Sequence, residues 1–169
     1  DGPRAGTVYE KISQLAPVFR PNGTVTAGNA CPLNDGAAAL IVMSDTRAKE
    51  LGLTPLARVV STGVSGISPE IMGLGPIEAV KKALAYAGMS ISDIDLFEIN
   101  EAFAVQVLGS ARALGIDEDK LNVSGGAIAL GHPFGMTGAR ITATLLNNLS
   151  THDKTFGIET MCVGGGQGM

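Results

Sequence analysis

The sequence has little of what nucleic-acid-binding proteins use. It contains no Trp and only five Phe and two Tyr, and its 12 Lys and Arg are outnumbered by 16 Asp and Glu, for a net charge of −4. Such proteins need a basic surface for the phosphates and often aromatic rings on which bases stack. We therefore expect no nucleic-acid partner.

The sequence also lacks long apolar runs, cysteine clusters and a targeting signal. No run approaches the roughly 18–20 residues of a membrane-spanning helix, and the first residues, DGPRAGTVYEK, have neither signal nor transit character. The two cysteines, Cys31 and Cys162, are far apart, and the two His have no metal-ligand spacing. We expect no disulfide scaffold, no metal and no membrane contact. We expect a cytoplasmic location of bacterial type, with an organellar matrix as the open alternative.

The sequence is rich in glycine and in apolar residues. Its 169 residues suit one domain, and an apolar share of 45% is enough for a core. Many of the 23 Gly gather in the last third of the chain, beside apolar runs. Glycines in such places indicate tight turns or a close approach of the backbone to a ligand.

Strands and helices are expected to alternate along the chain. The continuous apolar runs at 37–43 and 57–62 predict strands buried on both faces, and further strands are predicted at 96–99 and 155–162. Apolar residues at helical spacing, bounded by Pro76, Gly88 and Gly115, predict three helices, at 76–87, 102–114 and 137–149. This alternation predicts a layered α/β fold.

Residues 1–34 differ from the rest of the chain. They are polar and interrupted by Gly and Pro, with one helical stretch near 8–15. We expect them to form a connecting or covering segment. The first residue is not Met, and the chain stops directly after a glycine cluster, so we expect a fragment or an excised domain.

The first block that could form part of an active site is Asn100-Glu101-Ala102-Phe103-Ala104, where a predicted strand is followed by a helix. Ligands of open α/β sheets bind outside the carboxyl ends of strands, and the Asn100 amide can both donate and accept hydrogen bonds. The alternative is that Asn100 only caps the helix, a position that Asn favours.

The second block is the glycine-rich stretch 125–140, in which His132 lies between Gly131 and Pro133. It contains no Gly-Lys-Ser/Thr, so it is not a phosphate-binding loop. A His whose backbone is restrained ahead of a helix suits a general base. A surface-loop His is the alternative, and Thr137 is a candidate cap of the following helix.

The third block is CVGGGQGM at 162–169, where Cys162 ends a predicted strand and three Gly follow. Backbone N–H groups beside a thiol can lower its pKa or form an oxyanion hole. An inert buried Cys is the alternative. All three blocks fall at one predicted edge of the sheet, which is the arrangement that a shared pocket needs.

These three blocks together resemble the thiolase family. The segments GTVTAGNA at 23–30, LNDGAA at 33–38 and DGPR at 1–4 extend the resemblance over essentially the whole chain. It implies an acyltransferase that exchanges an acyl group between a 3-ketoacyl-CoA and CoA through a cysteine thioester. It also implies that residues 1–47 are the tail of the loop domain and of the N-terminal half. Residues 48–169 would be the C-terminal half, truncated before its last strand. The resemblance implies that this half is a layered α/β unit with a mixed central sheet flanked by helices.

The resemblance implies a role for each block. His132 would activate the nucleophilic Cys and help stabilise the thioester oxyanion, and Cys162 would be the acid/base for the α-proton and the leaving carbon. Asn100 would position an oxyanion-hole water, and the Gly164 N–H would donate to a second oxyanion hole. Coenzyme A would be a cosubstrate without being bound permanently, and its path would be lined by Arg4, Ala27, Gly28, Cys31, Met72, Ala102 and Phe103.

Two features depart from the family pattern. Cys31-Pro32 stands where many thiolases have Ser-Gly, and a thiol is a poorer hydrogen-bond donor than a hydroxyl. Neither Cys31 nor Cys162 matches the family nucleophile, which belongs to the N-terminal half. We therefore expect activity only from a full-length enzyme, a homodimer or homotetramer by analogy. A non-catalytic CoA- or lipid-binding relative is the alternative, together with a condensing enzyme that acts on carrier-bound chains.

Overall fold

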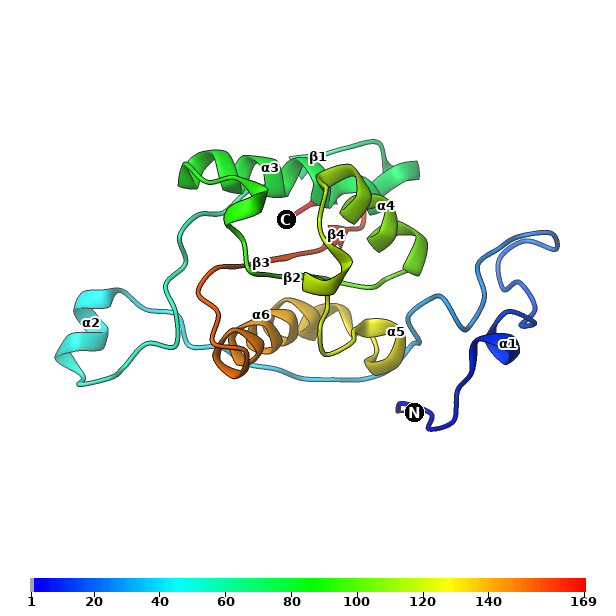
Figure 1. Cartoon of the computed structure of the whole chain (residues 1–169), viewed down its shortest axis with the longest axis horizontal. Coiled ribbons are helices and arrows are strands. Elements are labelled where there is room, and N and C mark those ends of the chain that lie inside the picture. Colours follow the sequence, from blue (N-terminus) through cyan, green and yellow to red (C-terminus); the bar gives the residue numbers. More distant parts are fainter. Residues whose placement is uncertain (1) are drawn as a thin grey trace.

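The computed structural model describes residues 2–169, and it has three layers (Figure 1). Strands β2 (Leu96–Ile99) and β3 (Gly157–Thr160) form the middle layer. Helix α6 (Phe134–Thr151) packs against one side of these strands, and helices α3 (Gly75–Ala87) and α4 (Ala104–Leu114) lie on the other side. The predicted layered α/β class is confirmed.

The strands form two small sheets that together make the arrangement mixed. β2 and β3 are parallel, with Leu96 opposite Gly157 and Ile99 opposite Thr160. The other sheet is antiparallel, in the order β1-β5-β4, and consists of Ser65–Gly66, Gln167–Gly168 and Cys162–Val163. The chain leaves β3 at Thr160 and enters β4 two residues later, so the predicted strand at 155–162 is divided between two partners.

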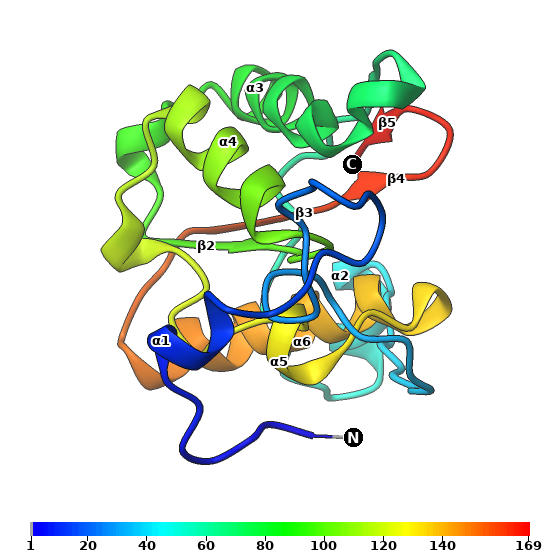
Figure 2. The same ribbon diagram turned by 90° about the vertical axis from the view of Figure 1, so that its right-hand side faces the viewer.

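The remaining elements are short. They are α1 (Tyr9–Ile12), α2 (Asp45–Glu50), α5 (Ala127–Leu130) and the 3-10 turns η1 (Pro69–Leu74), η2 (Ile91–Asp93) and η3 (Glu118–Lys120). α2 stands away from the layered body, and the segment before α2 crosses beneath α6 (Figure 1). Figure 2 shows the N-terminal segment passing in front of the β2–β3 pair, as expected for a covering segment. Within residues 2–169, none of the helices is long and apolar enough to cross a membrane.

The helix boundaries follow the expected signals with two corrections. α3 and α4 end before Gly88 and Gly115, whose φ angles of 66° and 71° suit glycine. α4 begins two residues later than predicted, because Phe103 is still extended and donates its N–H to Gln106 Oε1 at 3.1 Å. α6 begins at Phe134 after an extended Pro133, so Thr137 lies inside the helix and does not cap it.

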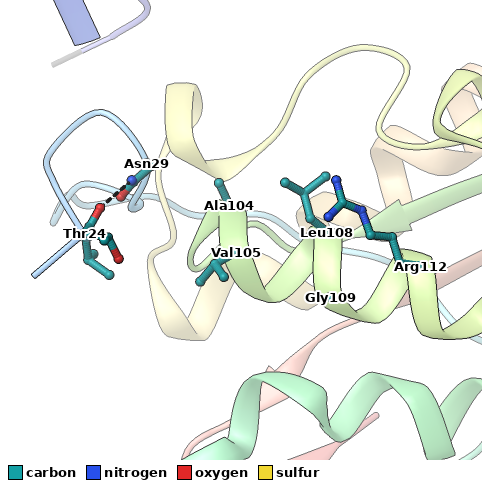
Figure 3. Close-up of a pocket in the computed structure, with 8 residues that line it drawn as sticks. Thr24, Asn29, Ala104, Val105, Leu108, Gly109 and Arg112 are labelled. Atoms are coloured by element: carbon teal, nitrogen blue, oxygen red, sulfur yellow. Dashed lines mark hydrogen bonds between the residues drawn. The ribbon is translucent and has the colours of Figure 1, made fainter. Parts of the chain in front are cut away.

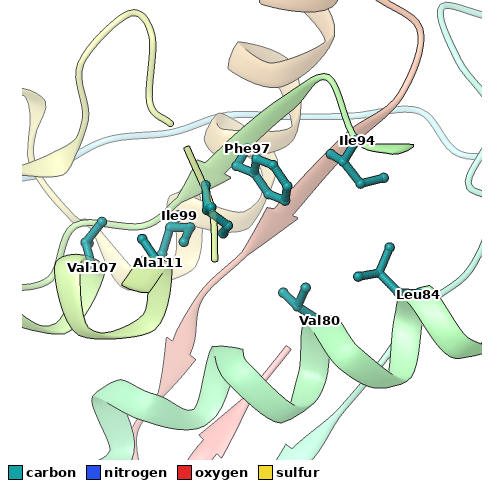
Figure 4. Close-up of a cluster of buried hydrophobic side chains, with 8 residues drawn as sticks. Val80, Leu84, Ile94, Phe97, Ile99, Val107 and Ala111 are labelled. Carbon is teal, nitrogen blue, oxygen red and sulfur yellow. The ribbon is translucent and has the colours of Figure 1, made fainter. Parts of the chain in front are cut away.

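The hydrophobic core lies between β2, α3 and α4 (Figure 4). Val80 and Leu84 of α3 face Phe97 and Ile99 of β2, while Val107 and Ala111 of α4, with Ile94 and Ile116, close the cluster. β2 is buried along its whole length, which agrees with a strand covered on both faces.

The predicted buried strands at 37–43 and 57–62 are wrong for this structure. Ile41, Val42 and Val59 are 87%, 81% and 71% exposed, and neither segment pairs with a described strand. A strand needs a neighbour for its backbone hydrogen bonds, and an apolar run cannot supply one by itself. These segments are therefore extended connections with exposed apolar side chains.

The contact between β5 and the start of α3 depends on glycine. A Cβ on Gly168 would lie 2.1 Å from the carbonyl carbon of Gly75, so the two backbones touch directly. We expect Gly168→Ala to lower the free energy of unfolding by about 3 kcal/mol, because backbone cannot give way as a flexible side chain can. Thermal or urea unfolding measures this loss.

Gly109 of α4 is the matched control for that substitution. A Cβ there would meet Leu74 Cδ2 at 3.5 Å, an ordinary contact. Gly109→Ala should raise stability by up to about 1 kcal/mol, because alanine favours helix. Equal stability changes for the two variants would contradict the close-packing argument.

Candidate active site

His132 lies on the short loop between α5 and α6, and this loop needs a glycine before the histidine. Gly131 has φ of 103°, and a Cβ on it would lie 2.0 Å from Asn34 Nδ2. That amide instead donates to the Leu130 carbonyl at 3.1 Å. The segment that carries Asn34 therefore holds the loop in place by direct contact.

The hydrogen bonds of His132 determine which ring nitrogen is available. Its Nδ1 lies 2.6 Å from Thr137 Oγ1, which itself donates to the Pro133 carbonyl at 3.0 Å. A hydroxyl has one proton, so Thr137 accepts from Nδ1–H, and the neutral ring carries its lone pair on Nε2. Burial and then the charge of Arg140 lower the pKa of His132 below its ordinary value. At neutral pH the ring is therefore an uncharged base.

Cys162 begins β4 opposite Gly168 and is 6% exposed. Burial raises the pKa of its thiol, and a charge on Cys31 would raise it further. Burial also raises the pKa of Cys31. Both thiols are therefore protonated at neutral pH, so each can give a proton and neither is a prepared thiolate nucleophile.

Asn100 directly follows β2 and is 1% exposed. Its N–H donates to the Thr160 carbonyl at 3.0 Å, and its own carbonyl accepts from Gln106 Nε2 at 3.3 Å. The interpretation of Asn100 as a helix cap is wrong, because α4 begins after Phe103. Within residues 2–169, the side-chain Nδ2 has no hydrogen-bond partner.

Three of the residues expected on the coenzyme A path lie next to Asn100. Cys31 donates its N–H to the Ala102 carbonyl at 3.0 Å, and Ala104 donates to Asn29 at 2.9 Å. The Phe103 ring meets Phe19 edge to face, with centroids 6.2 Å apart. The residues that follow β2 are therefore in direct contact with the segment around Cys31.

The structure does not bring the remaining predicted residues into that group. Met72 is half-buried in η1, and Gly28 lies under Ile12 of α1, whose Cγ2 is 2.3 Å from where a Cβ would be. Arg4, Ala27 and Gly164 are exposed. No contact recorded for the described residues joins Arg4 or Ala27 to Cys162 or His132.

A set of polar residues around the end of β2 was not predicted from the sequence. Asn122, with φ of 46°, accepts from the Ile99 N–H at 2.8 Å and donates to the Ile99 carbonyl at 2.9 Å, as a neighbouring strand would. Its Nδ2 also reaches Glu101 at 3.1 Å, and Glu101 accepts from Ile128 N–H of α5 at 3.1 Å. These contacts tie the Asn100 strand to the helix that precedes His132.

Glu98 and Arg140 form a second missed pair. Glu98 Oε1 lies 3.6 Å from Arg140 Nη1, with the side chains 2% and 13% exposed. Burial raises the pKa of Glu98 to about 7, against the charge of Arg140 and with the help of Glu101 and Glu159. A charged residue inside the apolar strand LFEI was the signal that could have identified this pair.

A groove along the outer face of α4 shares Asn29 and Ala104 with the surface around Cys31 (Figure 3). Asn29 donates to the Thr24 carbonyl at 2.9 Å on one side, and Leu108 and Arg112 of α4 lie on the other side. Its lining consists of Thr24, Val25, Asn29, Ala104, Val105, Leu108, Gly109 and Arg112, and it includes none of the predicted catalytic residues.

Comparison with known proteins identifies the family. Residues 53–169 match the model "Thiolase, C-terminal domain", and residues 1–46 match "Thiolase, N-terminal domain". This chain belongs to the thiolase family. The acetyl-CoA acetyltransferase of Escherichia coli K12 is 53% identical over 167 residues, which are 99% of this chain and 42% of that protein. The 3-ketoacyl-CoA thiolase of Cronobacter sakazakii is 56% identical over 170 residues, which are 98% of this chain and 44% of that protein.

Solved thiolase structures have the same fold. The Bacillus anthracis acetyl-CoA acetyltransferase superposes with a TM-score of 0.96 at 50% identity, over 99% of this chain and 43% of that one. A human mitochondrial 3-ketoacyl-CoA thiolase in complex with CoA gives a TM-score of 0.92 at 48% identity, with coverage of 99% and 43%. The thiolase chain described here thus spans less than half the length of these relatives.

Proposed function

We propose that the chain forms the C-terminal catalytic part of an acyltransferase that exchanges an acyl group between 3-ketoacyl-CoA and CoA. The observation that carries the proposal is the His132–Thr137 hydrogen bond, which leaves Nε2 as the free base on the loop that the Asn122–Glu101 contacts tie to Asn100. Family membership and the CoA complex of a relative support the substrate class. A non-catalytic CoA- or lipid-binding role does not explain an available base together with a buried thiol acid.

The chemistry divides between the named groups. Cleavage of the carbon–carbon bond leaves a carbanion, and Cys162 would supply the proton that the leaving carbon needs. His132 would take the proton of the thiol nucleophile through Nε2, and would help stabilise the thioester oxyanion. Asn100 Nδ2 would hold a water against that oxyanion, and the Gly164 N–H would serve a second oxyanion hole.

Coenzyme A would approach over the surface formed by Cys31, Ala102 and Phe103, with Arg4, Ala27, Gly28 and Met72 as the outer contacts. The nucleophilic thiol would come from the N-terminal half, because both thiols here have raised pKa values. We place the boundary between the halves near residue 47. The complete enzyme would be a homodimer or homotetramer in the cytoplasm, or in an organellar matrix.

The test compares two proteins in an acetoacetyl-CoA cleavage assay. The first is the 169-residue chain alone, and the second carries the same residues in place of the matching C-terminal part of the E. coli acetyl-CoA acetyltransferase. We expect no CoA-dependent cleavage by the chain alone and measurable turnover by the chimaera. Turnover by the chain alone, or a folded chimaera without turnover, would contradict the proposal. This chimaera is the complete enzyme in the experiments below.

A further inference from the structure

Arg140 is a buried cation whose hydrogen bonds are only partly satisfied. Its side chain is 13% exposed, and its Nε and Nη1 have no hydrogen-bond partner among residues 2–169. Its Nη2 lies 3.4 Å from Asn100 Oδ1, and its Nη1 lies 3.6 Å from Glu98 Oε1. Burying a guanidinium with unpaired donors is unfavourable, so the position of Arg140 calls for an explanation, and its neighbours suggest one.

The chemistry of the guanidinium determines how the Asn100 amide is turned. Arg has donors and no acceptor, so it can pair only with the oxygen end of the amide. The Nδ2 end must then point away from Arg140, and this buried donor has no partner among residues 2–169. If Arg140 were absent, the amide could rotate, because its two ends are nearly the same size.

The same cation acts on His132. Its charge is the second cause, after burial, of the lowered pKa of His132. Glu98, on the strand that carries Asn100, anchors Arg140, while Glu101 and Glu159 are the other charged groups that act on Glu98. Arg140, on α6, therefore contacts one site residue, Asn100, and its charge contributes to the lowered pKa of another, His132.

We propose that Arg140 is a positioning residue of the acyl-transfer site. It holds Asn100 Oδ1, so that Nδ2 faces the reacting oxygen. This inference rests on the proposed function, because it assigns Asn100 and His132 their roles in that reaction. It adds a residue that touches no substrate and acts through Asn100.

The experiment uses the complete enzyme with Arg140→Gln, Arg140→Lys, Asn100→Ala and the double variant Arg140→Gln/Asn100→Ala. Arg140→Gln should lower kcat by about 10- to 100-fold, the range of lost supporting hydrogen bonds around a site. KM for acetoacetyl-CoA should change by less than about threefold, since no substrate contact is lost. In the Asn100→Ala background the same change should cost less than about threefold in kcat, because the group through which Arg140 acts is gone.

The effect of the Arg140 charge on His132 can be measured without an activity assay. An NMR titration of His132, assigned with a His132→Asn variant, should show a higher pKa in Arg140→Gln than in the parent protein. Arg140→Lys keeps the positive charge, so its His132 titration should match the parent while kcat recovers only in part. Arg47→Gln, the same change on the exposed face of α2, is the matched control and should leave kcat and the titration unchanged.

The outcomes separate this inference from the proposed function. Additive losses in kcat for the double variant, or a His132 titration that Arg140→Gln does not move, would overturn the positioning role. A parent enzyme without turnover would instead overturn the proposed function. If Arg140→Gln does not fold, Arg140→Lys takes its place in the comparison. Its loss of kcat should be smaller in the Asn100→Ala variant than in the parent enzyme, and equal losses would overturn the positioning role.

Discussion

Replacing Cys162 with alanine in the complete enzyme should lower kcat for acetoacetyl-CoA cleavage by about 100-fold or more, the range of a lost acid/base. The thiol is 6% exposed and its pKa is raised by burial, so at neutral pH it is protonated and, in the proposed mechanism, it gives this proton to the leaving carbon. Alanine fills nearly the same space without a proton to give. Steady-state kinetics with acetoacetyl-CoA and CoA measures the loss.

Cys31→Ser is the matched control for the removal of a thiol. Cys31 stands next to Ala102, and the charge of its thiolate would act on Cys162. Because Cys31 is assigned to the coenzyme A path, its replacement by a better donor should change KM for CoA more than kcat. Near-parental kcat in Cys162→Ala, or an equal loss of kcat in Cys31→Ser, would refute the assignment of Cys162 as the acid/base.

His132→Ala should lower kcat by a similar factor of about 100 or more, because the base that takes the proton of the nucleophile is lost. His152 supplies the control, since it is the only other histidine of the sequence and lies exposed at the C-terminal end of α6. His152→Ala should leave kcat unchanged. Nearly equal rates for the His132→Ala variant and its parent would remove His132 from the mechanism.

The role of His132 as a base also predicts how the turnover of the parent enzyme changes with pH. The neutral imidazole is the active form, and a lowered pKa means that protonation begins only at lower pH. Turnover should therefore fall on acidification with a midpoint below about 6.5, the ordinary pKa of histidine. Thr137→Val removes the acceptor for Nδ1–H, so it should reduce kcat by less than His132→Ala does.

Much of the architecture could be predicted from local signals in the sequence. α3 and α4 end at the glycines that predicted their ends, and β2 spans the predicted residues Leu96–Ile99. Two helix starts differ from the prediction. α4 starts later because the Phe103 N–H pairs with Gln106, and α6 starts earlier, directly after the extended Pro133. These local signals work because helix caps and apolar spacing act over a few residues.

The contacts around the site could not be predicted in this way. Asn122 supplies the pairing that a strand would give to Ile99, although nothing in its surroundings in the sequence indicates it. The sequence predicts Thr137 as a helix cap, whereas in the structure its hydroxyl selects the tautomer of His132. In both cases the partner is a side chain whose direction depends on packing.

The sequence by itself determined the family, the layered α/β class and the three blocks that contain Asn100, His132 and Cys162, because motif residues and helix signals are local. Only the tertiary structure decided that 37–43 and 57–62 remain exposed, since a strand exists only beside a partner. It also brought Arg140 to Asn100 across 40 residues of chain and placed the Thr137 hydroxyl against Nδ1 of His132, which leaves Nε2 free. Hydrogen-bond direction and desolvation depend on what lies nearby in space, so neither effect can be predicted from the local sequence.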